Sequence, residues 1–223
     1  MGIETIAIIV ALIMSIVIHE MAHGYAANWL GDPTARLQGR LSPNPLVHID
    51  PLGSVIVPAL LFFSSAGFLF GWAKPVPYNP YNLSDQRYGE AKVAAAGPAV
   101  NLLLALIFGI LIQLADTLGL NAAFQALAAY IVFINILLAL FNLLPIPPLD
   151  GSKIISAVLP LGAAMRYQAF MRMVEQYGIL VLFIVLFLLI QVLWPYLFAV
   201  VLTVASLMTG LEPSEFLSLM RAV

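Results

Sequence analysis

Hydrophobic residues along this chain form long runs that few charged residues interrupt. Three of these runs cover about residues 3–29, 93–115 and 122–144. A helix needs about 20 apolar residues to cross roughly 30 Å of hydrocarbon. All three runs are long enough, so the pattern predicts three membrane-spanning core helices.

Two other apolar segments are less regular. Residues 52–70 are interrupted by Pro58 and several small or polar residues, and 178–210 contains Trp194-Pro195 in its middle. A straight helix through the charge-free stretch around Trp194 would be about 54 Å long, too long for one simple span. We therefore expect C-terminal helices at 178–210, and it stays open whether this segment crosses the membrane once or twice.

Prolines are dense between the first and second core helices. Residues 71–83 include Pro75, Pro77 and Pro80, which forbid a regular helix and favour extended chain and turns. We expect 52–83 to be a re-entrant and loop region that is partly extended.

Composition confirms the membrane setting. Hydrophobic residues make up 62% of the 223 and charged residues only 9%, whereas soluble domains carry about 25% charged residues. An ordinary soluble enzyme and a disordered tail are excluded, and a net charge of −2 gives no field that attracts nucleic acid. The chain has no cysteine, so thiol catalysis and Cys-ligated zinc are excluded. We predict an all-α polytopic membrane protein with five to six transmembrane helices, folded as one domain over 1–223.

The chemistry is concentrated in one short motif of the first core helix. His19-Glu20-Met21-Ala22-His23 is an HExxH sequence, in which both histidines lie on one helical face and can reach one metal ion. A chance match or a satisfied polar cluster would be the alternatives. Ionisable residues inside a spanning helix cost about 2.5 kcal/mol or more each, which favours a shared function such as metal binding.

A third protein ligand must come from elsewhere in the chain. The candidates are His48 and the acidic residues. Asp150 is the best placed of these, because it follows the prolines that end the apolar run 122–144. Asp150 could instead only cap a helix over 152–164. His48 could be an idle loop histidine or a transient fourth ligand that blocks a water site.

The motifs together resemble the site-2 proteases, which are intramembrane zinc metalloproteases. The resemblance rests on HEMAH at 19–23, Gly97-Pro98-Ala99-Val100-Asn101, and NLLPIPPLDG at 142–151. It implies one zinc ion per chain held by His19, His23 and Asp150, with Glu20 as the catalytic residue. The stretch 71–77 is similar to the membrane-associated loop of compact members, and the PDZ and CBS domains of many relatives are missing here.

The implied mechanism is hydrolysis of peptide bonds in or near transmembrane segments. Zinc would activate a water, with Glu20 as general base. Asn101 and Asn142 are candidates for substrate or oxyanion contacts, although either amide could have a structural role instead. The partners would be membrane proteins with a single transmembrane segment and the lipid bilayer, without nucleic acid.

Substrate helices must unwind before cleavage, and the 71–83 region with part of 52–70 could hold an unwound segment by strand addition. The alternative is a simple interfacial loop anchored by Trp72, Tyr78 and Tyr81. A zinc-binding transporter or a non-catalytic scaffold is the competing function, but the chain shows no internal repeat of the kind that transporters carry.

A shared metal ion also constrains the topology. The histidines lie toward the C-terminal end of the first span (3–29), and Asp150 lies beyond the C-terminal end of the 122–144 span. To reach one metal ion, these two ends must lie on the same side of the membrane, so the two helices must run parallel. Residues 52–70 then cannot cross fully. If 52–70 does not cross, eight Lys and Arg residues lie on one side of the membrane and none on the other. If 52–70 crossed, six would lie on one side and two on the other. The positive-inside rule then predicts a cell-membrane protein with its N-terminus outside and its active site toward the cytoplasm.

Overall fold

The computed structural model describes residues 2–63, 71–176 and 179–221, and within them every regular element is a helix. The prediction of an all-α polytopic membrane protein is confirmed. The shorter helical elements are α2 (Thr34–Leu37), η1 (Pro45–His48), η2 (Pro51–Ile56), α3 (Val57–Phe63), η3 (Pro80–Asn82), α5 (Ala115–Leu118), α7 (Asp150–Val158), α8 (Leu161–Gln176) and α10 (Pro213–Met220).

Four helices of the described chain are long and apolar enough to cross a membrane, and the apolar helical stretch Pro51–Leu61 is shorter. The four are α1 (Ile3–Trp29), α4 (Gly89–Gln113), α6 (Ala122–Asn142) and the Gln191–Thr209 part of α9 (Ile179–Thr209). They match the expected runs closely. The α4 helix begins at Gly89, four residues before the expected start at 93. Its first turn is polar, so the apolar run used for the prediction does not include that turn.

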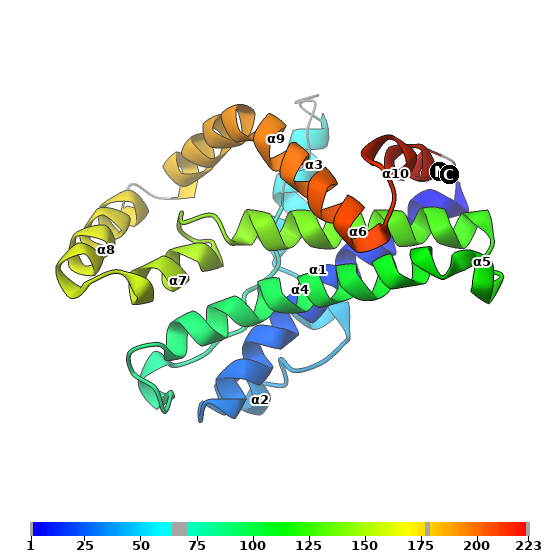
Figure 1. The fold of residues 1–223 in the computed structure, drawn as a ribbon. Coiled ribbons are helices and arrows are strands. Elements are labelled where there is room, and N and C mark those ends of the chain that lie inside the picture. Colours follow the sequence, from blue (N-terminus) through cyan, green and yellow to red (C-terminus); the bar gives the residue numbers. More distant parts are fainter. Residues whose placement is uncertain (1, 64–70, 177–178, 222–223) are drawn as a thin grey trace.

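The C-terminal apolar segment is one helix rather than two. α9 is continuous through Pro195, and Figure 1 shows it as a single helix bent in its middle. A proline inside a helix removes one backbone hydrogen bond and bends the helix without ending it.

The α4 helix is central and packs against α1, α6, α7 and α9. Small residues permit the close approach: Ala105 of α4, Ala129 of α6 and Ala205 of α9 are fully buried in one cluster. A Cβ at Gly109 would lie 2.7 Å from the backbone oxygen of Met208 in α9. Close packing of small residues is the usual means of helix association in membranes.

The helix directions agree with the topology expected from a shared metal ion. In Figure 1, α1 and α6 run in the same direction and α4 runs opposite to both. Trp72 lies against the start of the intervening segment: its N–H donates to the Gly53 carbonyl at 3.1 Å, and the Ser54 hydroxyl donates to the Trp72 carbonyl at 2.8 Å. The re-entrant course of 52–70 stays a prediction, because residues 64–70 lie outside the described chain.

Candidate metal centre and active site

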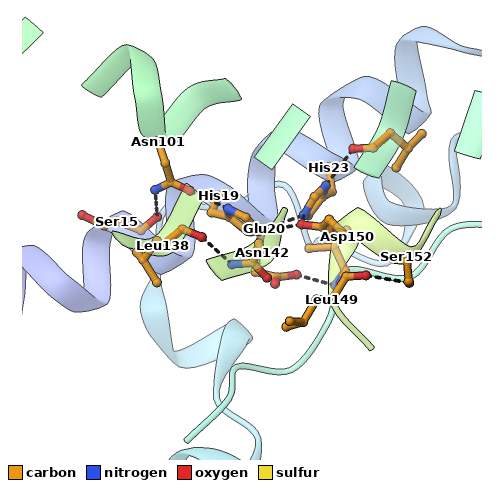
Figure 2. Close-up of polar contacts among 12 residues, drawn as sticks. Ser15, His19, Glu20, His23, Asn101, Leu138, Asn142, Leu149, Asp150 and Ser152 are labelled. Atoms are coloured by element: carbon orange, nitrogen blue, oxygen red, sulfur yellow. Dashed lines mark hydrogen bonds and ion pairs between the residues drawn. The ribbon is translucent and has the colours of Figure 1, made fainter. Parts of the chain in front are cut away.

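Three side chains from distant parts of the chain converge at one point. Nε2 of His19 and Nε2 of His23 each lie 3.2 Å from Oδ2 of Asp150, and the two nitrogens lie 3.1 Å apart (Figure 2). All three residues are nearly or fully buried. They are the single group in the described chain with the spacing to hold a metal ion.

Local structure explains how each ligand reaches this point. The histidines share one face of α1, and Asp150 is the first residue of α7, directly after the proline-rich end of α6. A Cβ on Gly151 would collide with the backbone oxygens of Leu143 and Leu144, so this turn requires glycine. No hydrogen bond described for α7 joins the Asp150 carboxylate to a backbone N–H, and its Oδ2 faces the two histidines, which speaks against a helix cap alone.

The protonation pattern of the group suits a cation at its centre. Nδ1 of His23 lies 2.7 Å from the Val93 carbonyl oxygen, which can only accept, so this nitrogen carries a proton. In the neutral ring, which is the form that binds a metal ion, Nε2 then presents a lone pair. Nδ1 of His19 donates in the same way to Oδ1 of Asn101 at 2.5 Å. Oδ2 of Asp150 is buried without a hydrogen-bond donor. Three acceptors facing one another repel unless a cation lies between them, and two imidazoles with one carboxylate suit zinc.

The α4 helix leaves room for these rings by having a glycine beside them. A Cβ at Gly97 would lie 2.5 Å from Nε2 of His23 and 2.6 Å from Nε2 of His19. Real Cβ atoms do not approach so closely, so the two imidazoles occupy the space that any larger residue would need.

A buried polar network lies behind His19. Asn101 Nδ2 donates to Oδ1 of Asn135 at 2.7 Å, and Asn135 Nδ2 donates to the Ser15 hydroxyl at 2.9 Å. Figure 2 shows Asn101 beside Ser15, whose carbonyl oxygen lies 3.5 Å from Asn101 Nδ2. Both asparagines have no exposed surface. Asn101, expected as a substrate or oxyanion contact, therefore contacts the ligand His19 instead of the cavity.

Asn135 and Ser15 are absent from the sequence-based predictions. The available signal was the position of Asn135 in the middle of an apolar helix, where an amide without a partner is costly. Its seven-residue distance from Asn142 also puts both on nearly the same face of α6.

A cavity of about 400 Å³ opens beside the metal group. Glu20, half-buried, lines it together with His19, His23 and Asp150, as the spacing within the motif predicts. Oε2 of Glu20 accepts a hydrogen bond of 2.9 Å from the Val76 N–H. Asn142 lines the same cavity, and its amide donates to the Leu138 carbonyl of its own helix at 3.0 Å.

Another wall of the cavity, the extended wall, is formed by chain without helix in the proline-rich region, where the prolines favour extended chain. Residues 71–79 contain no helix, and Gly71, Trp72, Ala73 and Val76 are among the lining residues.

His48 lies apart from the metal group. It is buried at the end of η1, and its Nε2 lies 3.0 Å from the Ser42 carbonyl oxygen. It is not among the residues with metal-ligand spacing.

Comparison with known proteins agrees with this geometry. The family model described as Peptidase family M50 matches residues 7–189, from the first span to beyond Asp150. The chain belongs to peptidase family M50. The resemblance to the site-2 proteases is thereby confirmed.

Individual M50 relatives carry metalloprotease names. "Putative zinc metalloprotease YwhC" of Bacillus subtilis is 40% identical over 199 residues, covering 85% of each chain. "Putative zinc metalloprotease Rip2" of Mycolicibacterium smegmatis is 33% identical over 148 residues, or 66% of this chain and 54% of the relative. "Zinc metalloprotease MJ0392" of Methanocaldococcus jannaschii is 24% identical over 67% of this chain and 33% of its own length. No solved structure matches the chain.

Proposed function

We propose that this M50 protein is an intramembrane zinc metalloendopeptidase, with residues 1–223 acting as a single catalytic domain. Its substrates would be membrane proteins with one transmembrane segment, cleaved in or near that segment. The observation that carries the proposal is the shared cavity, in which the Glu20 carboxylate lies beside the three converging ligands His19, His23 and Asp150.

Each residue has a role that follows from its contacts. His19, His23 and Asp150 would hold the zinc ion, which supplies Lewis acidity that polarises a carbonyl and lowers the pKa of water. Glu20 takes a proton from the attacking water and returns it to the leaving amine. Asn142 lines the cavity and is the candidate for contact with the substrate or the developing oxyanion.

The extended segment 71–79 is suited to holding an unwound substrate. A substrate helix must expose its backbone before cleavage, and an added strand can pair with extended chain. This segment forms one wall of the cavity, so a substrate strand beside it would lie next to Glu20.

We infer that the protein lies in the cell membrane with its N-terminus outside and its active site near the cytoplasmic face. The parallel α1 and α6 helices and the contact between Trp72 and Gly53 support this arrangement. If 52–70 does not cross, eight Lys and Arg residues gather on the active-site side. Reporter fusions at the N-terminus and within the α5 region should both locate outside the cytoplasm.

The test compares Glu20→Gln with Glu4→Gln, an exposed glutamate of the same helix. Each protein is purified in detergent, its zinc content is measured, and it is incubated with a panel of single-span substrates. We expect about one zinc per chain in all three proteins, with cleavage by the wild type and Glu4→Gln only, and loss of cleavage with a chelator. Equal cleavage by Glu20→Gln would overturn the proposal, and absence of zinc from the wild type would favour a non-catalytic scaffold.

A further inference from the structure

One peptide group of the extended segment lies between two charged side chains. The Pro75 carbonyl accepts a hydrogen bond from Nη2 of Arg40 at 3.3 Å, and the Val76 N–H donates to Oε2 of Glu20 at 2.9 Å. This oxygen and this nitrogen belong to the same peptide bond. The Pro75–Val76 peptide therefore connects the Arg40 guanidinium to the Glu20 carboxylate.

Arg40 is an unusual residue at this position because it is buried. It is 7% exposed, and no carboxylate of the described chain pairs with it. Nη2 also donates to the Lys74 carbonyl at 2.7 Å. A buried cation is costly unless its donors are satisfied. The side-chain hydrogen bonds described for Arg40 both come from Nη2 and go to the backbone of this one segment, while Nε is buried without a partner.

The orientation of the peptide is favourable at both ends. A trans peptide points its C=O and N–H in opposite directions, with partial negative charge on the oxygen and partial positive charge on the N–H. The oxygen faces a cation and the N–H faces an anion. Hydrogen bonds arranged in such a chain strengthen one another in a low-dielectric site.

The neighbouring residues leave this peptide few alternatives. Pro75 and Pro77 have no N–H, so Val76 is the single backbone donor between them. On the other side, the Lys74 N–H donates to the His48 carbonyl at 2.8 Å. The buried His48 therefore helps to fix the same segment.

We propose that Arg40 is a positioning residue for Glu20, acting through the Pro75–Val76 peptide. Arg40 and the His48 carbonyl hold the segment in place, and the Val76 N–H then holds the Glu20 carboxylate in its orientation within the cavity. This role rests on the proposed function of Glu20 as general base, but the contact itself can be tested without catalysis.

The contact is tested by hydrogen–deuterium exchange of the chelator-treated protein. The stretch 74–78 holds only the amides of Lys74, Val76 and Tyr78, so Val76 can be followed with little overlap. We expect faster exchange of the Val76 amide in Arg40→Gln and in Glu20→Ala, and unchanged exchange in Arg36→Gln, an exposed arginine of the neighbouring α2 helix. Unchanged Val76 exchange in Arg40→Gln would overturn the proposal.

Kinetics test the consequence for catalysis. We expect Arg40→Gln to lower kcat about tenfold or more, with KM within about twofold and zinc content unchanged, because a misplaced catalytic group slows the chemical step. Arg40→Lys can still donate to a carbonyl and should recover part of kcat, which provides a second variant if Arg40→Gln folds poorly. A kcat within twofold of the wild type in both variants would overturn the positioning role. Loss of zinc in parallel with activity would show a general structural role instead.

The two proposals fail separately. If Glu20→Gln cleaves as well as the wild type, the proposed function is wrong, while the exchange data still decide whether Arg40 fixes the Val76 amide.

Discussion

The two walls of the cavity are built on different principles. On the metal-holding wall, most contacts join side chains: His19 and His23 face Asp150, and Asn101 supports His19, while the Val93 carbonyl supports His23. On the extended wall, side chains contact backbone groups, as when Glu20 accepts from the Val76 N–H. The first wall therefore depends mainly on residue identity, and the second depends on the path of the chain and on the few residues that anchor it.

The largest expected effect is at the metal-holding wall, in Asp150→Asn. The substitution keeps the shape but removes the negative charge facing two imidazole lone pairs. We expect zinc content to fall well below one per chain and cleavage to fall by about a thousandfold or more, since a catalytic metal supplies several kcal/mol. Metal analysis and cleavage assays measure this, with the exposed Asp116→Asn as control. Zinc retained in full would show that Asp150 is not a ligand.

Gly97→Ala tests the same wall through space instead of charge. Its Cβ would meet Nε2 of His23 at 2.5 Å, closer than real Cβ atoms approach, so the rings or the helix must shift. We expect zinc affinity to fall by up to about a hundredfold, within the range for disturbed ligand surroundings. Competition with a chromophoric chelator measures the affinity. Gly162→Ala is the matched control, because a Cβ there meets no atom within 4 Å; equal affinities of the two variants would contradict the role assigned to Gly97.

Asn101→Ala and Asn142→Ala separate ligand support from cavity lining. Asn101 accepts from His19, so its removal leaves Nδ1 of that ring without an acceptor. We expect about a tenfold loss of zinc affinity in Asn101→Ala. Asn142 contacts only its own helix among the hydrogen bonds described, so its removal should leave zinc affinity unchanged and alter kcat or KM. The reverse pattern would return Asn101 to the substrate role that the sequence suggests.

The difference between the walls also explains what the sequence could predict. The spans, the parallel course of α1 and α6, and the convergence of His19, His23 and Asp150 follow from hydrophobic runs, the HExxH spacing and the proline-broken end of α6. These features are set by residue type at fixed intervals, which a sequence displays directly.

The extended wall could be predicted only in outline. Prolines indicate extended chain over 71–83, but a hydrogen bond from the Val76 N–H to Glu20 involves a backbone group that every non-proline residue has. Arg40 likewise gives no signal, because a loop arginine is usually solvated and here it is buried against carbonyl groups. Asn101 shows a related limit, because the sequence singles out this residue but does not show its buried partners His19 and Asn135.

The smallest expected effect is at an anchor of the extended wall, Asp32. This buried carboxylate accepts from the Asn79 N–H at 2.7 Å and from Asn82 Nδ2 at 2.8 Å, tying the end of the extended segment to the turn after α1. Burial alone would raise the pKa of the Asp32 carboxyl, but the hydrogen bonds from Thr34, Asn82 and Asn79 outweigh it and lower this pKa below its ordinary value of 3.8. A lowered pKa means that the stabilisation is fully present above pH 3.8 and is lost as the pH falls through the folded-state pKa.

Asp32→Asn should therefore destabilise the protein at pH 7 and matter less in acid. We expect a loss of about 1–2 kcal/mol in the free energy of unfolding at pH 7, or roughly 2–4 °C in Tm for each kcal/mol. Thermal unfolding of chelator-treated protein in detergent, followed from pH 7 to pH 3, should show the Tm gap to the wild type narrowing below pH 4, while Asp116→Asn shows no gap at pH 7. Because the anchor lies on the wall that depends on chain path, zinc content of the untreated variant at pH 7 should stay at the wild-type level. A Tm gap that widens in acid would mean that the Asp32 carboxylate is not the stabilising form, and a loss of zinc would mean that the two walls are coupled more tightly than their separate contacts suggest.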